Sequence, residues 1–429
     1  MKYEEAVEYI ESLNQYGIVP GLGNIWNLCE KLGNPQQELR FVHIAGTNGK
    51  GSVLAYVSTI LKAAGYRVGR YVSPVIFEYR ERIQINNRPI TKKALCALVE
   101  RIQGICEELT EEGKPHPTPF EVETAMAFQY FKEQGCDIVV LETGMGGRLD
   151  ATNIIENTLV AVLVSISMDH MQYLGKDLTT ITGEKAGILK TGCQVVTAWQ
   201  KPPVMEVIEK RAQRLQIPVT VAAAEKAGKI RYGLEKQRFD YEEWKNLEIG
   251  LAGKHQIDNA VVAIEVIKAL SQKGFAVPEK ALRQGLKETQ WLGRFSVIGR
   301  KPFFLVDGAH NEDAARKLAE SIEFYFTNKR IIYIIGILRD KEYEKIIALT
   351  HSYADQILAV ATPNQARTLS AYELATQIAR FHPKVTAVDS LEEAVELAYL
   401  LADKEDVIIA FGSLSFMGQI MNIVKKRKA

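Results

Sequence analysis

The fold is decided by the stretch His43-Ile44-Ala45-Gly46-Thr47-Asn48-Gly49-Lys50-Gly51-Ser52, which joins a strand to a helix through a glycine-rich loop. The apolar run 40–45 predicts the strand, and a helical pattern of about fourteen residues follows the loop and ends near Gly65. Glycines let backbone N–H groups turn toward a phosphate, and the N-terminus of a helix adds partial positive charge. The stretch therefore predicts a nucleotide phosphate site, in which Lys50 would reach the β- and γ-phosphates and Ser52 would ligate Mg²⁺.

This loop departs from the general phosphate-loop pattern at two positions. The pattern has a glycine five residues before the position of Gly49, and a serine or threonine directly after the lysine. This chain has Ile44 and Gly51 at those positions. A glycine-rich turn without a ligand is the alternative interpretation, but the combination of strand, lysine and helix favours a shortened phosphate-binding loop.

Apolar β-branched runs alternate with helix-period stretches along the chain, a pattern typical of parallel sheets covered by helices. In the first half we expect strands at 68–72, 138–141 and 159–166, and helices near 94–108 and 121–134. The strand at 159–166 is apolar on both faces, which indicates burial inside a parallel sheet.

The second half repeats this pattern after a less regular segment. Over 193–250 we expect two short strands and an antiparallel patch around 230–241, followed by a helix over 255–270. Five more strands are expected, at 303–306, 330–336, 356–361, 385–388 and 407–411. Glycine and proline interrupt the periodicity within 291–301 and at Pro302. We therefore expect domains at 1–295 and 296–429.

Composition narrows the class of protein. The 429 residues are 47% hydrophobic and 24% charged, and 53 Lys and Arg balance 52 Asp and Glu. These fractions are typical of a globular protein. The balanced charge argues against a nucleic-acid binder held by phosphate contacts, so the basic tail 425–428 is interpreted as a solvated terminus. The longest nearly unbroken apolar run, 159–168, is too short to span a membrane, and the N-terminus lacks a secretory pattern. Five scattered cysteines without a CxxC pair exclude a zinc ribbon, so we expect a cytoplasmic protein.

Three further polar residues come directly after predicted strands. Ser73 follows 68–72, Glu142 follows 138–141, and His170 closes the segment after 159–166. Ligands of open parallel sheets bind at the carboxyl edge, where a hydroxyl, a carboxylate and an imidazole would suit a divalent metal on ATP oxygens. Singly, each has a structural interpretation, as a turn, a solvated strand end or a buried histidine. Their shared edge favours a site.

Longer motifs now stand in order along nearly the whole chain. They are Gly46–Ser52, Ser73-Pro74, Arg80-Glu-Arg-Ile83, Glu142-Thr-Gly-Met-Gly-Gly-Arg-Leu-Asp-Ala-Thr-Asn153, Met168-Asp-His170, Glu184-Lys-Ala-Gly187, Asp307-Gly-Ala-His-Asn311 and Gly412-Ser-Leu414. In this combination the chain resembles the folylpolyglutamate synthase/dihydrofolate synthase family of the Mur ligase superfamily. The resemblance implies an α/β protein: an N-terminal P-loop-type ATPase domain with a mainly parallel sheet, and a smaller C-terminal Rossmann-like domain.

The resemblance also assigns roles to residues at the matching positions. It implies that Lys50, His170, Lys185 and His310 are catalytic. It implies that ATP is bound by Thr47, Asn48, Gly49, Lys50, Gly51, Ser52, Asn259, Arg294 and Asp307. It implies two Mg²⁺ sites, with ligands among Ser52, Ser73, Glu142, His170 and Lys185, and it leaves room for a monovalent cation. It implies substrate contacts at Arg82, Thr118, Phe120, Glu121, Thr152, Asn153, Ile154 and Ser413, with Pro119 departing from the family's Thr-Phe-Phe-Glu.

Lys185 has two interpretations. A surface ion pair is the common fate of a lysine, whereas the family carries a carbamylated lysine at this motif, which turns a cation into a carboxylate-like metal ligand. Carbamylation requires a neutral amine, so we expect burial, or the charges of Lys50 and a metal, to lower the pKa of Lys185.

The activity that the resemblance implies is ATP-driven amide formation between a folate or dihydropteroate carboxylate and the amine of L-glutamate, through an acyl phosphate. The two domains would close over the site to exclude water. A cell-wall Mur ligase is one alternative, but only 45 residues precede Gly46. A nucleotide-dependent switch is another, but the guanine signature Asn-Lys-x-Asp is absent from the sequence. We expect the protein to be a monomer that acts on small-molecule substrates and binds neither nucleic acid nor a membrane. The preferred folate and the length of the glutamate chain stay open.

Overall fold

The computed structural model describes residues 1–17, 21–363 and 367–428, and within them the chain forms two compact units. The first comprises Met1–Ser73, Glu78–Ala227 and Asp258–Thr289, and the second comprises Pro74–Phe77, Gly228–Ile257 and Gln290–Ala429. Because each unit takes more than one segment of chain, the expected boundary at 295/296 stays a prediction. No helix among the described residues is both long and apolar enough to cross a membrane.

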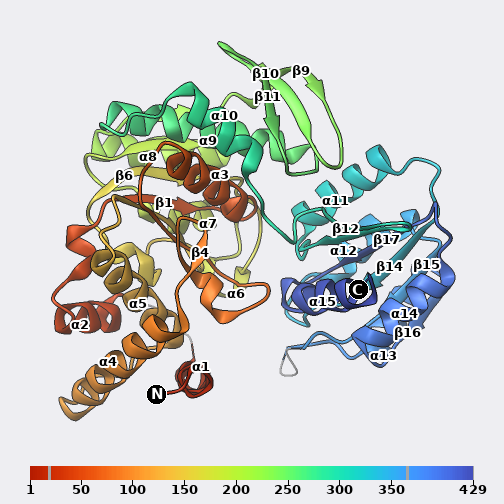
Figure 1. Ribbon diagram of the computed structural model, residues 1–429, viewed down its shortest axis with the longest axis horizontal. Helices are drawn as coiled ribbons and strands as arrows, with labels where there is room; N and C mark the ends of the chain where they lie inside the picture. Colours follow the sequence, from red (N-terminus) through yellow and green to blue (C-terminus); the bar gives the residue numbers. More distant parts are fainter. Residues whose placement is uncertain (18–20, 364–366, 429) are drawn as a thin grey trace. The chain divides into compact units, whose positions relative to one another are not determined.

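The first unit is built on an eight-stranded sheet of order β4-β3-β2-β5-β1-β6-β7-β8 (Figure 1). Its strands are β1 (Phe41–Ala45), β2 (Val68–Tyr71), β3 (Ile83–Ile85), β4 (Arg88–Pro89), β5 (Ile138–Glu142), β6 (Thr158–Leu163), β7 (Gln194–Thr197) and β8 (Val219–Val221). Six neighbouring strands of this sheet run parallel, in the order β2-β5-β1-β6-β7-β8. Strands β3 and β4 are antiparallel and form the edge beside β2. Every residue of β1 and β5 is buried, as the apolar runs predict.

Helices cover this sheet and supply its core. They are α1 (Tyr3–Ser12), α2 (Gly23–Lys31), α3 (Lys50–Ala63), α4 (Lys92–Glu111), α5 (Pro119–Glu133), α6 (Met171–Leu174), α7 (Leu178–Lys185), α8 (Pro202–Leu215), α9 (His255–Gln272), whose first turn belongs to the second unit, and α10 (Glu279–Glu288). Apolar side chains of α5 pack on Phe41, Val139 and Leu141, and those of α8 pack on Ala161 and Val195. Helix α10 packs closely on α3, since a Cβ on Gly285 would lie 2.4 Å from the Ile60 Cα.

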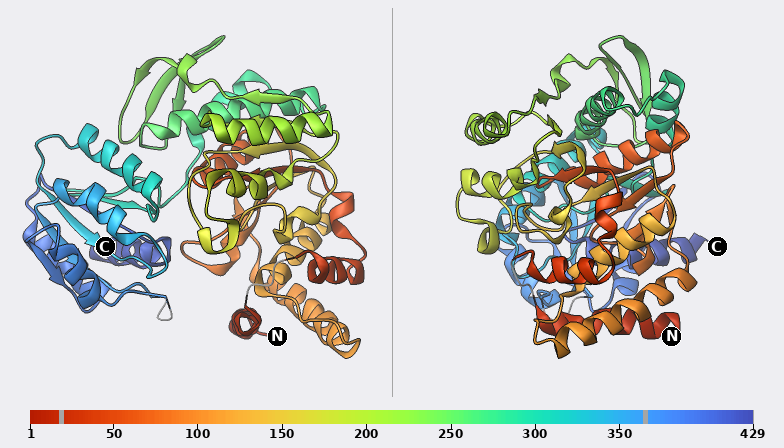
Figure 2. Two further views of the ribbon diagram at one scale, coloured as in Figure 1. Left: turned by 180° about the vertical axis from the view of Figure 1, so that it is seen from behind. Right: turned by 90° about the vertical axis from the view of Figure 1, so that its left-hand side faces the viewer.

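The second unit has a six-stranded sheet of order β12-β13-β17-β14-β15-β16, parallel except for β12, with helices on both faces (Figure 2). Its strands are β12 (Ser296–Arg300), β13 (Phe303–Asp307), β14 (Ile331–Ile335), β15 (Gln356–Ala359), β16 (Val385–Ala387) and β17 (Val407–Phe411). Its helices are α11 (Glu312–Tyr325), α12 (Tyr343–Thr350), α13 (Ala371–Ala379), α14 (Leu391–Leu401) and α15 (Met417–Lys428). The first three share one apolar core with the sheet, and α14 and α15 share the other.

The antiparallel patch expected around 230–241 is a three-stranded sheet of β9 (Gly228–Arg231), β10 (Gln237–Tyr241) and β11 (Trp244–Ile249) in the second unit. All the other predicted strands are present, with ends that differ by no more than three residues, and the predicted α/β fold is confirmed. The largest shift is at β6, which ends at Leu163 rather than at residue 166.

Candidate active site

The glycine-rich loop after β1 is fixed from beside by the chain that continues from β6. The backbone N–H groups of Thr47 and Asn48 donate to the Ser165 carbonyl at 2.8 and 3.3 Å, and the Thr47 hydroxyl donates to the Ser167 carbonyl at 3.0 Å. Gly46 has a φ of +148°, and a Cβ there would lie 2.2 Å from Val164. The loop therefore has one backbone path, for which glycine is required.

The second glycine of the loop meets α9. Gly49 caps α3 with a φ of +99°, and a Cβ on it would lie 2.6 Å from the Asn259 side-chain oxygen. The structure thus brings Asn259 to the glycine-rich loop. Gly51 and Ser52 follow in the first turn of α3, where both are buried.

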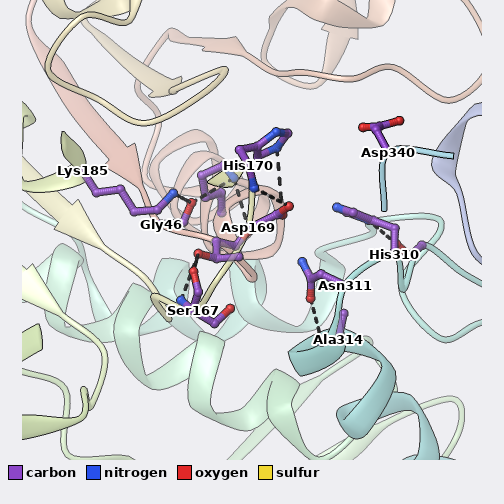
Figure 3. Close-up of polar contacts among 12 residues, drawn as sticks. Gly46, Ser167, Asp169, His170, Lys185, His310, Asn311, Ala314 and Asp340 are labelled. Atoms are coloured by element: carbon purple, nitrogen blue, oxygen red, sulfur yellow. Dashed lines mark hydrogen bonds and ion pairs between the residues drawn. The ribbon is translucent and has the colours of Figure 1, made fainter. Parts of the chain in front are cut away.

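Two lysines converge on one carbonyl oxygen of this loop. Lys50 Nζ donates to the Gly46 and Thr47 carbonyls at 3.2 and 3.3 Å. Lys185 Nζ donates to the same Gly46 carbonyl at 2.8 Å, as Figure 3 shows. Lys185, the last residue of α7, is only 3% exposed. Burial is the largest cause that lowers the pKa of Lys185; together with the charge of Lys50, and against the opposing charges of Asp169 and Asp150, it brings that pKa to about 7. The predicted lowering is confirmed, whereas the carbamate stays a prediction.

The polar residues predicted at the carboxyl edge are found at their strand ends. Glu142 is the last residue of β5, is 5% exposed, and accepts a long hydrogen bond of 3.5 Å from the Ser73 backbone. His170 has a φ of +51°, and its backbone N–H donates to the Asp169 carboxylate at 2.9 Å, as Figure 3 shows. Asp169 lies within the motif Met168-Asp-His170, for which only His170 has a predicted role. Its carboxylate lies 3.9 Å from His170 Nε2, and its charge opposes the lowering of the Lys185 pKa.

This edge supplies the oxygen atoms that Mg²⁺ prefers. Among the described residues, no three His, Cys, Asp or Glu side chains form a ready metal site. Mg²⁺ does not require one, because it usually keeps several waters and binds through one or two carboxylates together with substrate phosphates. The carboxylate of Glu142 and the hydroxyls of Ser52 and Ser73 fit that chemistry.

The loop after β5 is held by buried polar contacts. Asp150 accepts hydrogen bonds from the Met145 backbone at 2.8 Å and from the Thr152 hydroxyl at 2.5 Å, and that hydroxyl also lies 2.9 Å from His43 Nε2. The side chains of Thr152, Asn153 and Ile154 are 0, 4 and 2% exposed. They stabilise the loop from inside, and their contact with a substrate stays a prediction.

The start of α5 carries the next predicted group. Glu121 Oε2 accepts from the backbone and the hydroxyl of Thr118 at 2.7 and 2.8 Å, which forms a capping box. Pro119 occupies the first helical position, where the missing N–H costs nothing, so the departure from the family motif is compatible with the helix. Phe120 abuts the loop after β5, since a Cβ on Gly144 would lie 2.6 Å from its ring.

Arg82 is held by an acid that the sequence analysis missed. Its guanidinium lies 3.2 Å from the Glu123 carboxylate, which also accepts from the Tyr79 hydroxyl at 2.9 Å. Glu123 is buried, and burial raises its pKa while Arg82 opposes that rise. Nothing in the local sequence of α5 signals this partner, because Arg82 is far away along the chain.

In the second unit, the predicted residues follow two adjacent strands, β13 and β17. Asp307 ends β13 and accepts from the backbone N–H groups of Phe295 and Ala309 at 2.7 and 2.8 Å. Burial raises the pKa of Asp307, and the nearby charge of Arg294 opposes the rise. Arg294 passes close to the strand end, because a Cβ on Gly308 would lie 2.2 Å from its Nη1.

His310 and Ser413 complete this second group. His310 Nδ1 donates to the Gly308 carbonyl at 2.7 Å. The buried Ser413 lies two residues after β17 and caps a short 3₁₀ turn, with its hydroxyl 2.8 Å from that of Ser415. Since β13 and β17 are parallel neighbours, their carboxyl ends bring these residues to one edge.

Comparison with known proteins assigns both units. The Mur ligase middle domain matches residues 44–267, and the glutamate ligase domain of Mur ligases matches residues 293–414. The chain is 35% identical over 435 residues to the dihydrofolate synthase/folylpolyglutamate synthase of Bacillus subtilis (strain 168), covering 99% of both chains. The chain belongs to the folylpolyglutamate synthase/dihydrofolate synthase family. The expected class, an ATP-dependent ligase, is thereby confirmed.

Solved structures of this family have the same fold. Folylpolyglutamate synthase of Mycobacterium tuberculosis, complexed with ADP and AMPPCP, has a TM-score of 0.91 and 30% identity over 99% of both chains. An FPGS–AMPPCP–folate complex has a TM-score of 0.85 and 30% identity over 98% of both chains. Family members with this fold therefore bind ADP, the nucleotide analogue AMPPCP and folate.

Proposed function

We propose that this chain is an acid–amino-acid ligase that adds L-glutamate to folates, with dihydropteroate as a second acceptor. The observation that carries the proposal is the pair of lysines on the Gly46 carbonyl beside the Glu142 edge of the sheet. The family membership and the folate-bound relative support the choice of substrates.

The chemistry requires activation of a poor electrophile. An oxygen of the folate carboxylate would attack the γ-phosphorus of ATP, so that a bond to phosphorus forms, ADP leaves and an acyl phosphate results. The neutral amine of glutamate would then attack the acyl carbon, and phosphate would leave from the tetrahedral intermediate as the amine loses its proton. Lys50 would stabilise the charge on the transferring phosphoryl group, mainly by position and electrostatics.

Mg²⁺, bound with ATP, would neutralise charge on the phosphate oxygens during this transfer. We infer that Ser52, Ser73 and Glu142 hold a first ion, and that Glu142 and His170, with a modified Lys185, hold a second. In the second unit, Arg294 and Asp307 would contact the nucleotide, while His310 and Ser413 would act toward the phosphate and the substrate.

The modification of Lys185 is a carbamate. A neutral amine attacks CO₂, a C–N bond forms and a proton leaves, which converts a buried cation into a carboxylate-like oxygen ligand. The support is geometric: the side chain is buried, and its Nζ meets a backbone carbonyl rather than a carboxylate. An ammonium at that place would repel Mg²⁺, whereas a carbamate would bind it.

We also infer a cytoplasmic monomer that acts on small molecules. All five cysteines are free, as expected in a reducing compartment.

The experiment that tests the function is ADP release with dihydropteroate, tetrahydrofolate or methylenetetrahydrofolate, each with and without glutamate. A ligase requires both organic substrates for steady turnover. A rate of ADP release that does not change when folate and glutamate are added would instead indicate a nucleotide switch or a simple ATPase.

A further inference from the structure

Two glycines let the loop after β5 lie directly on the chain that carries Lys185. A Cβ on Gly147 would lie 2.8 and 2.9 Å from the carbonyl oxygens of Lys185 and Glu184. A Cβ on Gly187 would lie 2.4 Å from the Arg148 Cα. All three distances are shorter than a real Cβ contact allows, so the two backbones lie this close only because both positions are glycine.

Arg148 makes the principal polar contacts across this junction. Its backbone N–H donates to the Glu184 carbonyl at 2.7 Å. Its guanidinium lies against the Glu184 carboxylate, with Nη2 at 2.8 Å and Nε at 3.1 Å from Oε1. Such a forked pair fixes the orientation of both partners better than a single contact does. Glu184 immediately precedes Lys185, so this pair holds the last turn of α7.

The side chain of Asn153 also connects the loop after β5 to the segment that follows α7. Asn153 donates through Nδ2 to the Arg148 carbonyl at 3.1 Å and to the Gly187 carbonyl at 3.3 Å, and so joins the two segments. The loop begins at Glu142, the predicted Mg²⁺ ligand, and the joined segment contains Lys185. One interlocked assembly therefore spans two residues of the site.

We propose that Arg148 is a positioning residue, which sets the place of the Lys185 amine on the phosphate loop through its pair with Glu184. The inference rests on the proposed function in giving Lys185 a part in turnover. Nothing in it requires Arg148 to touch a substrate. Its side chain is 54% exposed, so its removal leaves the core of the unit unchanged.

The test is a double-mutant cycle of Arg148→Ala, Glu184→Gln and the double variant. If Arg148 and Glu184 position Lys185 together, each single variant lowers kcat by about ten- to a hundredfold, which is the loss that a small misplacement of a catalytic group produces. The double variant loses no more than the single ones, and the KM values for ATP, folate and glutamate change less than twofold. The matched control is the Arg283–Glu279 pair on α10, which has a similar distance of 2.7 Å. Arg283→Ala is expected to leave kcat unchanged.

A second readout does not depend on activity. In CO₂-free buffer, an amine-reactive reagent followed by peptide mass spectrometry measures the labelling rate of Lys185. The wild-type lysine is expected to be protected, and Arg148→Ala is expected to raise its labelling at least fivefold, whereas Arg283→Ala leaves it protected.

The outcomes are separable. Additive losses with a raised KM for one substrate would make Arg148 a substrate contact and overturn the proposal, as would unchanged kcat and unchanged labelling. If the wild-type enzyme releases no ADP with any folate, the proposed function fails, and the labelling rates still decide whether Arg148 positions Lys185.

Discussion

Lys50→Ala separates the chemistry of the phosphate loop from its folding. The substitution removes two hydrogen bonds, to the Gly46 and Thr47 carbonyls. The Gly46 carbonyl keeps a partner, because Lys185 donates to it at 2.8 Å. We therefore expect Lys50→Ala to fold normally and to lose turnover.

Lys50→Ala is expected to change the free energy of unfolding much less than it changes the transition-state stabilisation. A net hydrogen bond contributes about 1 kcal/mol to stability, and the bonds of Lys50 are long, so the free energy of unfolding should fall by no more than about 1 kcal/mol. Losing a donor that stabilises developing charge costs about 3 kcal/mol of transition-state stabilisation, which corresponds to a kcat about 150-fold lower.

The assay is steady-state ADP release with saturating ATP, folate and glutamate, beside urea unfolding of the same protein. The control is Lys62→Ala, which removes an exposed lysine from the last turn of the same helix and should change neither quantity. A Lys50→Ala enzyme within a few-fold of wild type would remove the loop from the mechanism. If the free energy of unfolding fell by about 3 kcal/mol, as much as the transition-state stabilisation, Lys50 would be a structural residue.

Three further predictions concern other parts of the molecule. Arg294→Ala should raise the KM for ATP and lower kcat together; an unchanged ATP dependence with normal turnover would make this residue structural only. Lys185→Ala should lose activity and regain part of it with formate or acetate, whereas Lys185→Arg should not be rescued, because a guanidinium fills the space and stays charged; full activity of Lys185→Ala would contradict the carbamate. Burial lowers the pKa of His43 and of His255 to about 3, so each histidine stabilises the fold above its unfolded pKa of 6.5, and that contribution is lost as the pH falls. Between pH 7 and pH 5 the loss is about 2 kcal/mol for each histidine, and urea unfolding of His43→Gln should show a pH dependence weaker than that of wild type by this amount.

Local sequence predicted the strands, the glycine-rich loop between β1 and α3 and the residues at the strand ends well, for a physical reason. Alternating apolar runs and glycines at strand ends act over a few residues, and parallel strands automatically bring their carboxyl ends to one edge. Ser73 and Glu142 were found from this rule alone.

Contacts between distant segments were not predictable in this way. Glu123 is a buried acid on α5, and its partner Arg82 comes from another part of the chain. The Arg148–Glu184 pair likewise joins residues 36 positions apart. The contacts of the Thr152 hydroxyl with Asp150 and His43 were not predictable from the motif either, and its contact with a substrate stays a prediction. Spacing along the chain carries no information about such pairings.

The central claim is that ATP activates the folate carboxylate as an acyl phosphate, and oxygen transfer tests it directly. Folate labelled with ¹⁸O in its terminal carboxylate is turned over with ATP, Mg²⁺ and glutamate, and the released phosphate is analysed by mass spectrometry. The mechanism predicts one ¹⁸O atom in each phosphate released, because the attacking carboxylate oxygen leaves with phosphorus. Phosphate without label in the presence of normal glutamylation would contradict it.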